Sequence, residues 1–424
     1  MASVPNVAAG FSPLDDELGL LPGQLTPRLQ EGLVRLSTHI PSFAKAAKEF
    51  AFFTQVEVHR TTASRISEAA GATAVALQTD EAEGILHTHP LPPPGPEQIV
   101  FSVDGAMVPL VGGVWAEART LVVGEPLLGT NAEGEQVVQT NRLSYFSRLA
   151  DSATFGELAT SEIHRRGVET AGRVGAVVDG AEWCQTFIDL HAPQATRILD
   201  FPHAASYVDA IGQTVGAQGE LLSATERSSL CHDLKHSGPT TVVERLRSTV
   251  GEAGGIGESL TQLAYLEKRL EQMDYPRFMA EQWPIASGTV ESANKLVVEE
   301  RLKGAGMHWA EENVNPMLAL RNAICSDRWV EVWTQIEEEQ RREARARRMQ
   351  RQRQRRVSAA LSAGERSVVE ANPRLQDRKP EGGGSASAGE VAERPAAERG
   401  HPAASHPWRK PWSIRRQREI ASTA

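Results

Sequence analysis

The chain of 424 residues is long enough for about two to four domains, and its 40% hydrophobic and 23% charged residues are typical of a globular protein. No apolar run approaches the roughly 18 residues of a membrane span, and the start of the chain lacks the basic and apolar segments of a secretory signal. Three widely separated cysteines, Cys184, Cys231 and Cys325, argue against a disulfide framework and a local zinc clamp, so we expect an intracellular protein.

Charge is unevenly distributed along the chain. Residues 341–424 hold 20 of the 45 basic and 9 of the 54 acidic residues, which leaves 25 basic and 45 acidic residues in the remainder. An acidic body with a basic tail fits an enzyme that gathers metal ions at carboxylates and meets a polyanion elsewhere. It fits equally well a solvated acidic surface followed by a tail without function.

Residues 1–86 are predicted to form a helical module. His59 to Ala70 has helical periodicity, and we expect Gly71 to end this helix. With the helical segment before it, the arrangement resembles a helix-turn-helix, whose second helix would place Arg60 and Arg65 against DNA. An ordinary helical hairpin shows the same pattern and remains the alternative.

Residues 87–98 are rich in proline and predict a hinge. The next domain, expected over 99–338, alternates strand and helix patterns, with its first helix beginning near Ser152. Three strands, helix, strand, helix, strand, helix is the order of an RNase H-like α/β core, in which an antiparallel meander is continued by parallel units. The predicted strands cover residues 99–104, 115–123, 137–146, 174–178 and 195–199.

Residues 216–284 show helical patterns but no strand, and are predicted to be a helical insertion in this domain. Helix is expected again over 290–302 and 314–335. Residues 339–424 are predicted to be an arginine-rich arm and a disordered tail. Nine arginines between residues 341 and 356, without an apolar stripe, indicate either a solvated helix or a disordered arm.

Two apolar strands end in the same phrase, Val-Asp-Gly-Ala, which contains Asp104 and Asp179. Carboxylates at the carboxyl ends of neighbouring strands lie where α/β sheets bind ligands, and their mutual repulsion favours a hard divalent cation. An ordinary Asp-Gly turn is the alternative. Glu291, early in a helix that Ser287 or Thr289 would cap, is the candidate third acid for two metal ions, or else a capping-box acid.

Four phrases, in this order, resemble bacterial insertion-sequence DDE transposases of the ISKra type over roughly residues 30 to 335: 101–105, 178–183, 198–203 and 288–294. The resemblance implies an RNase H-like catalytic domain, two Mg²⁺ or Mn²⁺ ions, and cleavage and transfer of the ends of a mobile element. By position, Asp104, Asp179 and Glu291 match the catalytic, metal-binding acids of the family. The first 100 residues lack the cysteines of the amino-terminal segment that the family often has.

The same resemblance assigns a secondary motif, and the position of two basic residues predicts a DNA contact. Asp200 and His203 match the Asp-x-x-His signature, in which His203 would touch the scissile phosphate or order a metal ligand. The alternative is a helix cap by Asp200 with His203 packed against it. Arg301 and Lys303 lie beyond Glu291 on its helix and would hold DNA phosphates.

The expected function is that of a DNA transposase, which binds element ends and catalyses metal-dependent phosphodiester cleavage and strand transfer. We expect double-stranded DNA as partner, a homo-oligomer on DNA, no membrane association, and a cytoplasmic, nucleoid-associated location. Two alternatives stay open: an RNase H-like nuclease without strand transfer, and an inactive DNA-binding protein derived from a transposase.

Overall fold

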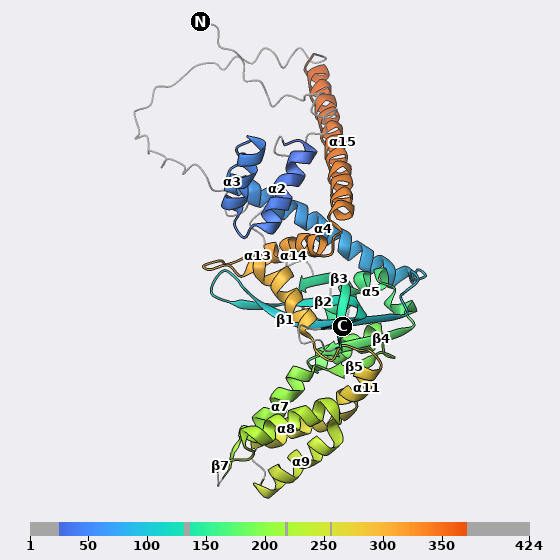
Figure 1. The fold of residues 1–424 in the computed structure, drawn as a ribbon. Helices are drawn as coiled ribbons and strands as arrows, with labels where there is room; N and C mark the ends of the chain where they lie inside the picture. The colour runs from blue at the N-terminus through green and yellow to red at the C-terminus, as the bar shows by residue number, and fades with distance from the viewer. Residues whose placement is uncertain (1–24, 131–135, 217–218, 255–256, 371–424) are drawn as a thin grey trace, which may run out of the picture. The chain divides into compact units, whose positions relative to one another are not determined.

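The computed structural model describes residues 25–130, 136–216, 219–254 and 257–370 (Figure 1). The chain divides into two compact units, Met1–Arg351 and Gln352–Ala424, and the fold given below is that of the first. From residue 371 onward, the expected disordered tail lies outside the described residues. No helix among the described residues is long and apolar enough to cross a membrane.

Five strands form one mixed sheet in the order β3-β2-β1-β4-β5. β1, β2 and β3 are antiparallel neighbours, whereas β4 runs parallel to β1 and β5 runs parallel to β4. The prediction of an antiparallel meander followed by parallel strands is therefore confirmed, and the fold is mixed α/β. The strands are β1 (Gln98–Pro109), β2 (Trp115–Thr130), β3 (Gln136–Leu149), β4 (Arg173–Val178) and β5 (Thr196–Leu199).

Helices precede the sheet, connect its last strands and follow it (Figure 1). Local capping explains where some of them begin: Thr26 caps α2, with a proline directly after it, and Asp151 caps α5 through two backbone N–H groups. The main helices are α2 (Pro27–His39), α3 (Phe43–Thr54), α4 (Arg60–Thr88), α5 (Ser152–Arg165), α6 (Glu182–His191), α7 (Phe201–Gln213), α8 (Ala224–His236), α9 (Pro239–Glu252), α10 (Gly257–Glu267), α11 (Tyr275–Ala280), α14 (Glu311–Cys325) and α15 (Trp329–Glu370).

Residues 288–302 form one continuous helix in three parts. They are α12 (Gly288–Ala293), the π-helical segment η3 (Asn294–Glu299) and α13 (Glu300–Leu302). The residues at both junctions have right-handed helical backbone angles, so the axis is not broken. π-Helical turns inside α-helices are rare and occur frequently at functional sites.

The two faces of the sheet are buried by different helices. Alternate residues of β1, Phe101 and Val103 among them, pack against α5 and α6. The residues between them face the opposite way, where Ala106 and Val108 join a core formed by α2, α4, α12, η3 and α14. The amino-terminal helices thus share a core with the sheet. A third core, around the buried Trp283, joins the sheet to α7 and to the helices of the predicted insertion, α8 to α11.

The prediction that Gly71 ends a helix is wrong. α4 continues to Thr88 because Gly71 supplies a close contact with α14. A Cβ atom built at Gly71 would lie 2.3 Å from the backbone oxygen of Pro316. Only a residue without a side chain allows the two helices to approach this closely.

Three further expectations differ from the structure. β1 does not end at Asp104, because β2 pairs with it without interruption as far as Pro109. At the start of the insertion, two strands of two residues each, β6 (Val215–Gly216) and β7 (Gly219–Glu220), pair antiparallel where no strand was predicted. The helix predicted over 314–335 is two helices, α14 and α15, because Asp327 between them has φ 54°, in the left-handed region.

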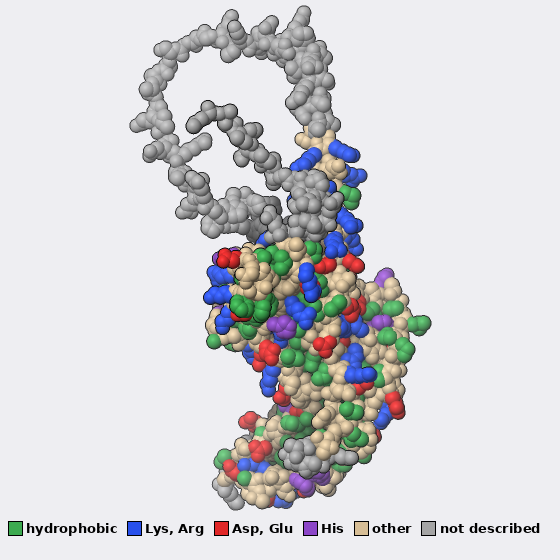
Figure 2. Space-filling model, turned by 45° about the horizontal axis from the view of Figure 1, so that its top comes forward, with side chains coloured by type: hydrophobic (Ala, Val, Ile, Leu, Met, Phe, Trp, Pro, Cys, Tyr) green, Lys and Arg blue, Asp and Glu red, His purple; other side chains and the backbone are tan. Residues whose placement is uncertain are grey.

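The arginine-rich stretch is helical. α15 runs through residues 341–356 to Glu370, and every side chain from 341 to 358 is exposed. Of the two interpretations left open by the sequence, the structure therefore shows the solvated helix. Figure 2 shows Lys and Arg side chains along the described part of this helix.

Gly71→Ala should destabilise the protein by about 1–3 kcal/mol, because an added methyl group meets the backbone of α14 and forces the helices apart. Gly84→Ala, in the same helix, is the matched control. A Cβ atom there meets nothing within 4 Å, so this variant should be more stable by about 0.5–1 kcal/mol. Denaturant unfolding of both variants measures the difference, and equal effects would contradict the described contact.

Candidate active site

Three acids from separate parts of the chain are gathered over the central strand of the sheet. The parallel pairing of β1 with β4 aligns Phe101 with Ala176, each three residues before an aspartate, and the charge of Asp179 acts on Asp104. Asp179 directly follows β4, as predicted. The helix 288–302 contacts β1 and β2 and carries Glu291 near its start.

The pKa of Asp104 responds to the charges of the other two acids. Burial raises the pKa of Asp104 above its usual 3.8, and the charges of Asp179 and Glu291 raise it further. Hydrogen bonds from the Gly105 N–H and from Asn294 act in the opposite direction. Because the net shift of the Asp104 pKa is upward, ionisation of this carboxyl group costs more free energy in the folded protein than in the unfolded chain.

Asn294 fixes the orientation of Asp104, and the sequence interpretation missed it. Its Nδ2 donates to Asp104 Oδ2 at 2.9 Å, while the Gly105 N–H donates to Oδ1 at 2.7 Å. The Oδ1 atom of Asn294 is buried and has no hydrogen-bond partner within the described residues. The sequence signal for Asn294 was its position three residues after Glu291, which places both residues on the same face of the helix.

The turn that carries Asp179 is held from two sides. Cys184 Sγ lies 3.4 Å from Asp179 Oδ1, and burial and this carboxylate raise the pKa of the Cys184 thiol, so it remains a donor. From the insertion, the Tyr265 hydroxyl donates to the backbone oxygen of Asp179, and Arg269 Nη2 donates to that of Gly180 at 2.6 Å.

Gly180 is the residue that allows this approach. Its φ of 80° lies in the left-handed region, and a Cβ atom there would lie 2.3 Å from Tyr265 Oη. Arg269 in turn lies 3.7 Å from the centre of the Tyr265 ring. No local pattern in the insertion could have identified Tyr265 and Arg269, because their role depends on how α10 packs onto the sheet.

Asp200 caps α7, which was the alternative to a role in the active site, and it also connects two helices. Its Oδ2 accepts from the His203 N–H at 2.9 Å and caps α7, and its Oδ1 accepts from the Ser287 N–H at 2.6 Å. Ser287 is the N-cap of α12, as predicted, but its side chain makes no capping bond. Asp200 therefore ties the start of α7 to the start of the helix that carries Glu291.

His203 packs among aromatic rings beside the site. Its ring lies 5.2 Å from that of Tyr207 and 6.1 Å from that of Tyr265, and these two tyrosines are stacked at 4.3 Å. Through Tyr265 it is one residue removed from the backbone of Asp179. Its catalytic role remains a prediction.

The four predicted DNA-binding residues separate into two groups. Arg60, Arg65 and Arg301 line one cleft of about 730 Å³, although Arg301 is buried rather than exposed. Lys303 is exposed and pairs with Glu299 at 2.7 Å on the same helix.

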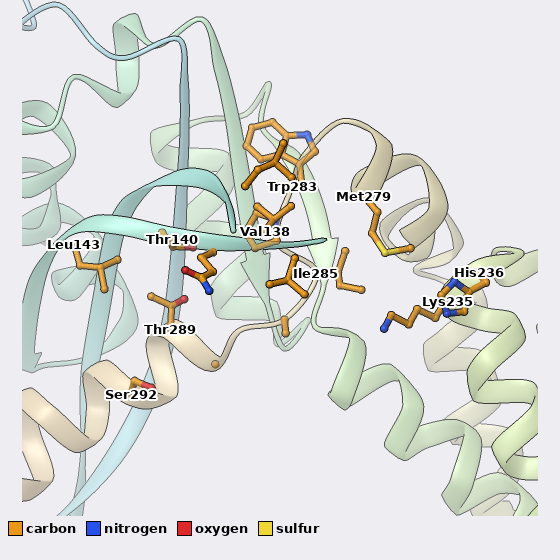
Figure 3. A pocket seen from close by; sticks show the side chains of 16 residues that line it. Val138, Thr140, Leu143, Lys235, His236, Met279, Trp283, Ile285, Thr289 and Ser292 are labelled. Atoms are coloured by element: carbon orange, nitrogen blue, oxygen red, sulfur yellow. The ribbon is translucent and has the colours of Figure 1, made fainter. Parts of the chain in front are cut away.

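A second and larger cleft, of about 940 Å³, is lined by residues of the helix that carries Glu291, although none of the three acids lines it (Figure 3). Thr289 and Ser292, on either side of Glu291 in sequence, form one wall, and residues of the β2–β3 hairpin such as Thr140 and Leu143 face them. Lys235 and His236, at the end of α8, line the far side in Figure 3. The cleft therefore offers hydroxyl and basic side chains to a ligand.

The donors present suit a hard divalent cation. Carboxylate and amide oxygens are the ligands that Mg²⁺ and Mn²⁺ prefer, and a cation would relieve the repulsion that raises the pKa of Asp104. Among the described residues, no group of three or more His, Cys, Asp or Glu side chains is arranged to hold an ion.

Comparison with known proteins gives no family for this chain. No protein-family model matches it, and no curated protein sequence matches it either.

Asp104→Asn should stabilise the metal-free protein at neutral pH. Because the folded chain raises the pKa of Asp104, the fold loses stability as the pH rises from 3.8 through the raised pKa, and the substitution removes this loss. The gain should fade below pH 3.8, where the acid is protonated in both states. Thermal melting over a pH series with a chelator measures the gain.

Mg²⁺ should raise the melting temperature of the unsubstituted chain more than that of Asp104→Asn. At 100 times the dissociation constant, the added stability is about 2.7 kcal/mol. In the pH series with chelator, a profile of melting temperature against pH that Asp104→Asn leaves unchanged would contradict the placement of Asp104 against the other two acids.

Proposed function

We propose that this protein is a divalent-metal-dependent DNA transposase with an RNase H-like catalytic core. The observation that carries the proposal is the convergence of Asp104, Asp179 and Glu291 over the central strand of a sheet with the order β3-β2-β1-β4-β5. This strand order is the one expected of an RNase H-like core. The acids belong to three of the four phrases that resemble DDE transposases.

Each residue of the site has a role in this proposal. Asp104, Asp179 and Glu291 would hold two Mg²⁺ or Mn²⁺ ions, and Asn294 sets the direction of the Asp104 carboxylate. Such ions would supply charge stabilisation for the attacking and leaving oxygens of an in-line displacement at a phosphodiester. Tyr265 and Arg269 fix the backbone on which Asp179 lies. The cleft beside Thr289 and Ser292 receives the DNA strand.

Replacement of any one acid should abolish catalysis without unfolding the protein. Asp104→Asn, Asp179→Asn and Glu291→Gln should each lower metal-dependent DNA cleavage by more than about 100-fold, since loss of one ligand disables the whole unit. A second replacement should cost little more. The substrate is duplex DNA with the sequences that flank the reading frame, incubated with Mg²⁺ or Mn²⁺.

Glu299→Gln is the matched control. Glu299 lies on the same helix and forms an exposed pair with Lys303, so its loss should leave cleavage unchanged. Robust cleavage by Asp104→Asn or Glu291→Gln would contradict the assignment of the three acids. Cleavage without joined products identifies a nuclease, and binding without cleavage by the unsubstituted chain identifies an inactive DNA-binding protein.

The exposed arginines of α15 support DNA as the partner. Arg345, Arg351, Arg353 and Arg355 point into solvent, in a part of the helix that carries nine arginines between residues 341 and 356. Replacing these four with Gln should weaken binding to DNA of any sequence. The slope of log affinity against log salt concentration should become shallower by up to about 0.9 per residue that contacts a phosphate. An unchanged slope would assign this helix to solvent.

A further inference from the structure

The cleft of about 730 Å³ on the amino-terminal side of the molecule is unlike the larger cleft. It is lined by the starts of α3 and α4 and by the loop that joins α13 to α14. Arg60 and Arg65 enter it from the first two turns of α4, and His308 enters it from the loop. The positive end of a 29-residue helix therefore lies at the same place as these basic side chains.

Arg301 is the most unusual residue of this lining. It is only 1% exposed, and among the described residues it forms no ion pair. Its Nε donates to the Ser37 backbone oxygen at 2.8 Å, and its guanidinium lies 4.7 and 5.0 Å from the rings of Phe43 and Trp309. Its Nη2 is buried without a hydrogen-bond partner in the described part of the chain.

A buried and unpaired guanidinium is costly unless an anion compensates it. Burial, and next the charge of Arg321, lower the pKa of Arg301 to about 10 against the opposing charge of Glu68, so it is still charged at neutral pH. Arg60 and Arg65 are exposed and have no carboxylate partner in the described residues. Glu68, bonded to Ser64, is the one acid among the residues that line the cleft.

We infer that this cleft binds a phosphate of the DNA backbone, with the anion between Arg60 and Arg65 and in the field of Arg301. Phe43 and Trp309 supply an apolar wall for the sugar and base next to that phosphate. The inference rests on the proposed function only in taking DNA as the polyanion. It differs from the helix-turn-helix interpretation, because residues that line a cleft and bind a phosphate do not read bases.

The decisive variant is the double substitution Arg60→Gln/Arg65→Gln in the full chain, since both side chains are exposed and their loss leaves the core intact. Binding to duplex DNA should weaken to the same extent for flanking and random sequences. The salt slope should become shallower by about 1.8, the effect of two phosphate contacts. An unchanged slope, or a loss confined to one sequence, overturns the inference.

Lys45→Gln/Lys48→Gln is the matched control. It removes two exposed charges from α3, neither of which lines the cleft, and should change the slope by less than half as much. Glu68→Gln gives a test of opposite sign. Removing the negative charge from the lining should tighten DNA binding, a result that general damage to the fold would not produce.

Inorganic pyrophosphate separates DNA from a small phosphate compound. If it raises the melting temperature of the unsubstituted chain but not of Arg60→Gln/Arg65→Gln, while the DNA salt slope is the same for both, the cleft holds a free phosphate and the inference is overturned. DNA cleavage is scored separately. A shallower slope with cleavage that survives Asp104→Asn supports the cleft and refutes only the catalytic proposal.

Discussion

The parallel pairing of β1 with β4 is the constraint on which the site depends. Backbone hydrogen bonds fix the register of the two strands up to Phe101 and Ala176, and this register directs Asp104 and Asp179, each three residues further on, to the same end of the sheet. A shift of β1 by one residue would turn Asp104 toward α5 and α6, into an apolar core. Burial of the whole strand β1 stabilises this register, and this stabilisation opposes the repulsion between the acids.

Much of this fold could be predicted because its signals are local. Strand alternation and the punctuation by Gly and Asp identified all five strands of the sheet, and the acids were visible as charges that interrupt apolar runs. The predictions were wrong where a residue far away in the sequence determines the local structure. Gly71 continues a helix because Pro316 lies against it, and β1 passes Asp104 because β2 is long enough to pair with it.

The supporting residues of the site could not be predicted for a related reason. Asn294 was in view beside Glu291, but its hydrogen bond to Asp104 spans 190 residues of sequence. Tyr265 and Arg269 act on Asp179 from an insertion whose only sequence signal was helical periodicity. Arg301 was predicted to hold a DNA phosphate, but its position after Glu291 does not reveal the rings of Phe43 and Trp309 around it.

The continuous helix 288–302 sets the distance between Glu291 and Arg301. It carries Glu291 near one end and Arg301 near the other, ten residues on. At no more than about 1.5 Å per residue, since the π-helical turns rise less, these two positions are at most about 15 Å apart along the axis, which corresponds to at most about four base pairs of duplex at a rise of about 3.4 Å. If one phosphate is held in the cleft beside Arg301 and another is cut at Glu291, the helix fixes the spacing between them. Its length, rather than any contact with bases, then sets the distance between the anchored and the broken bond.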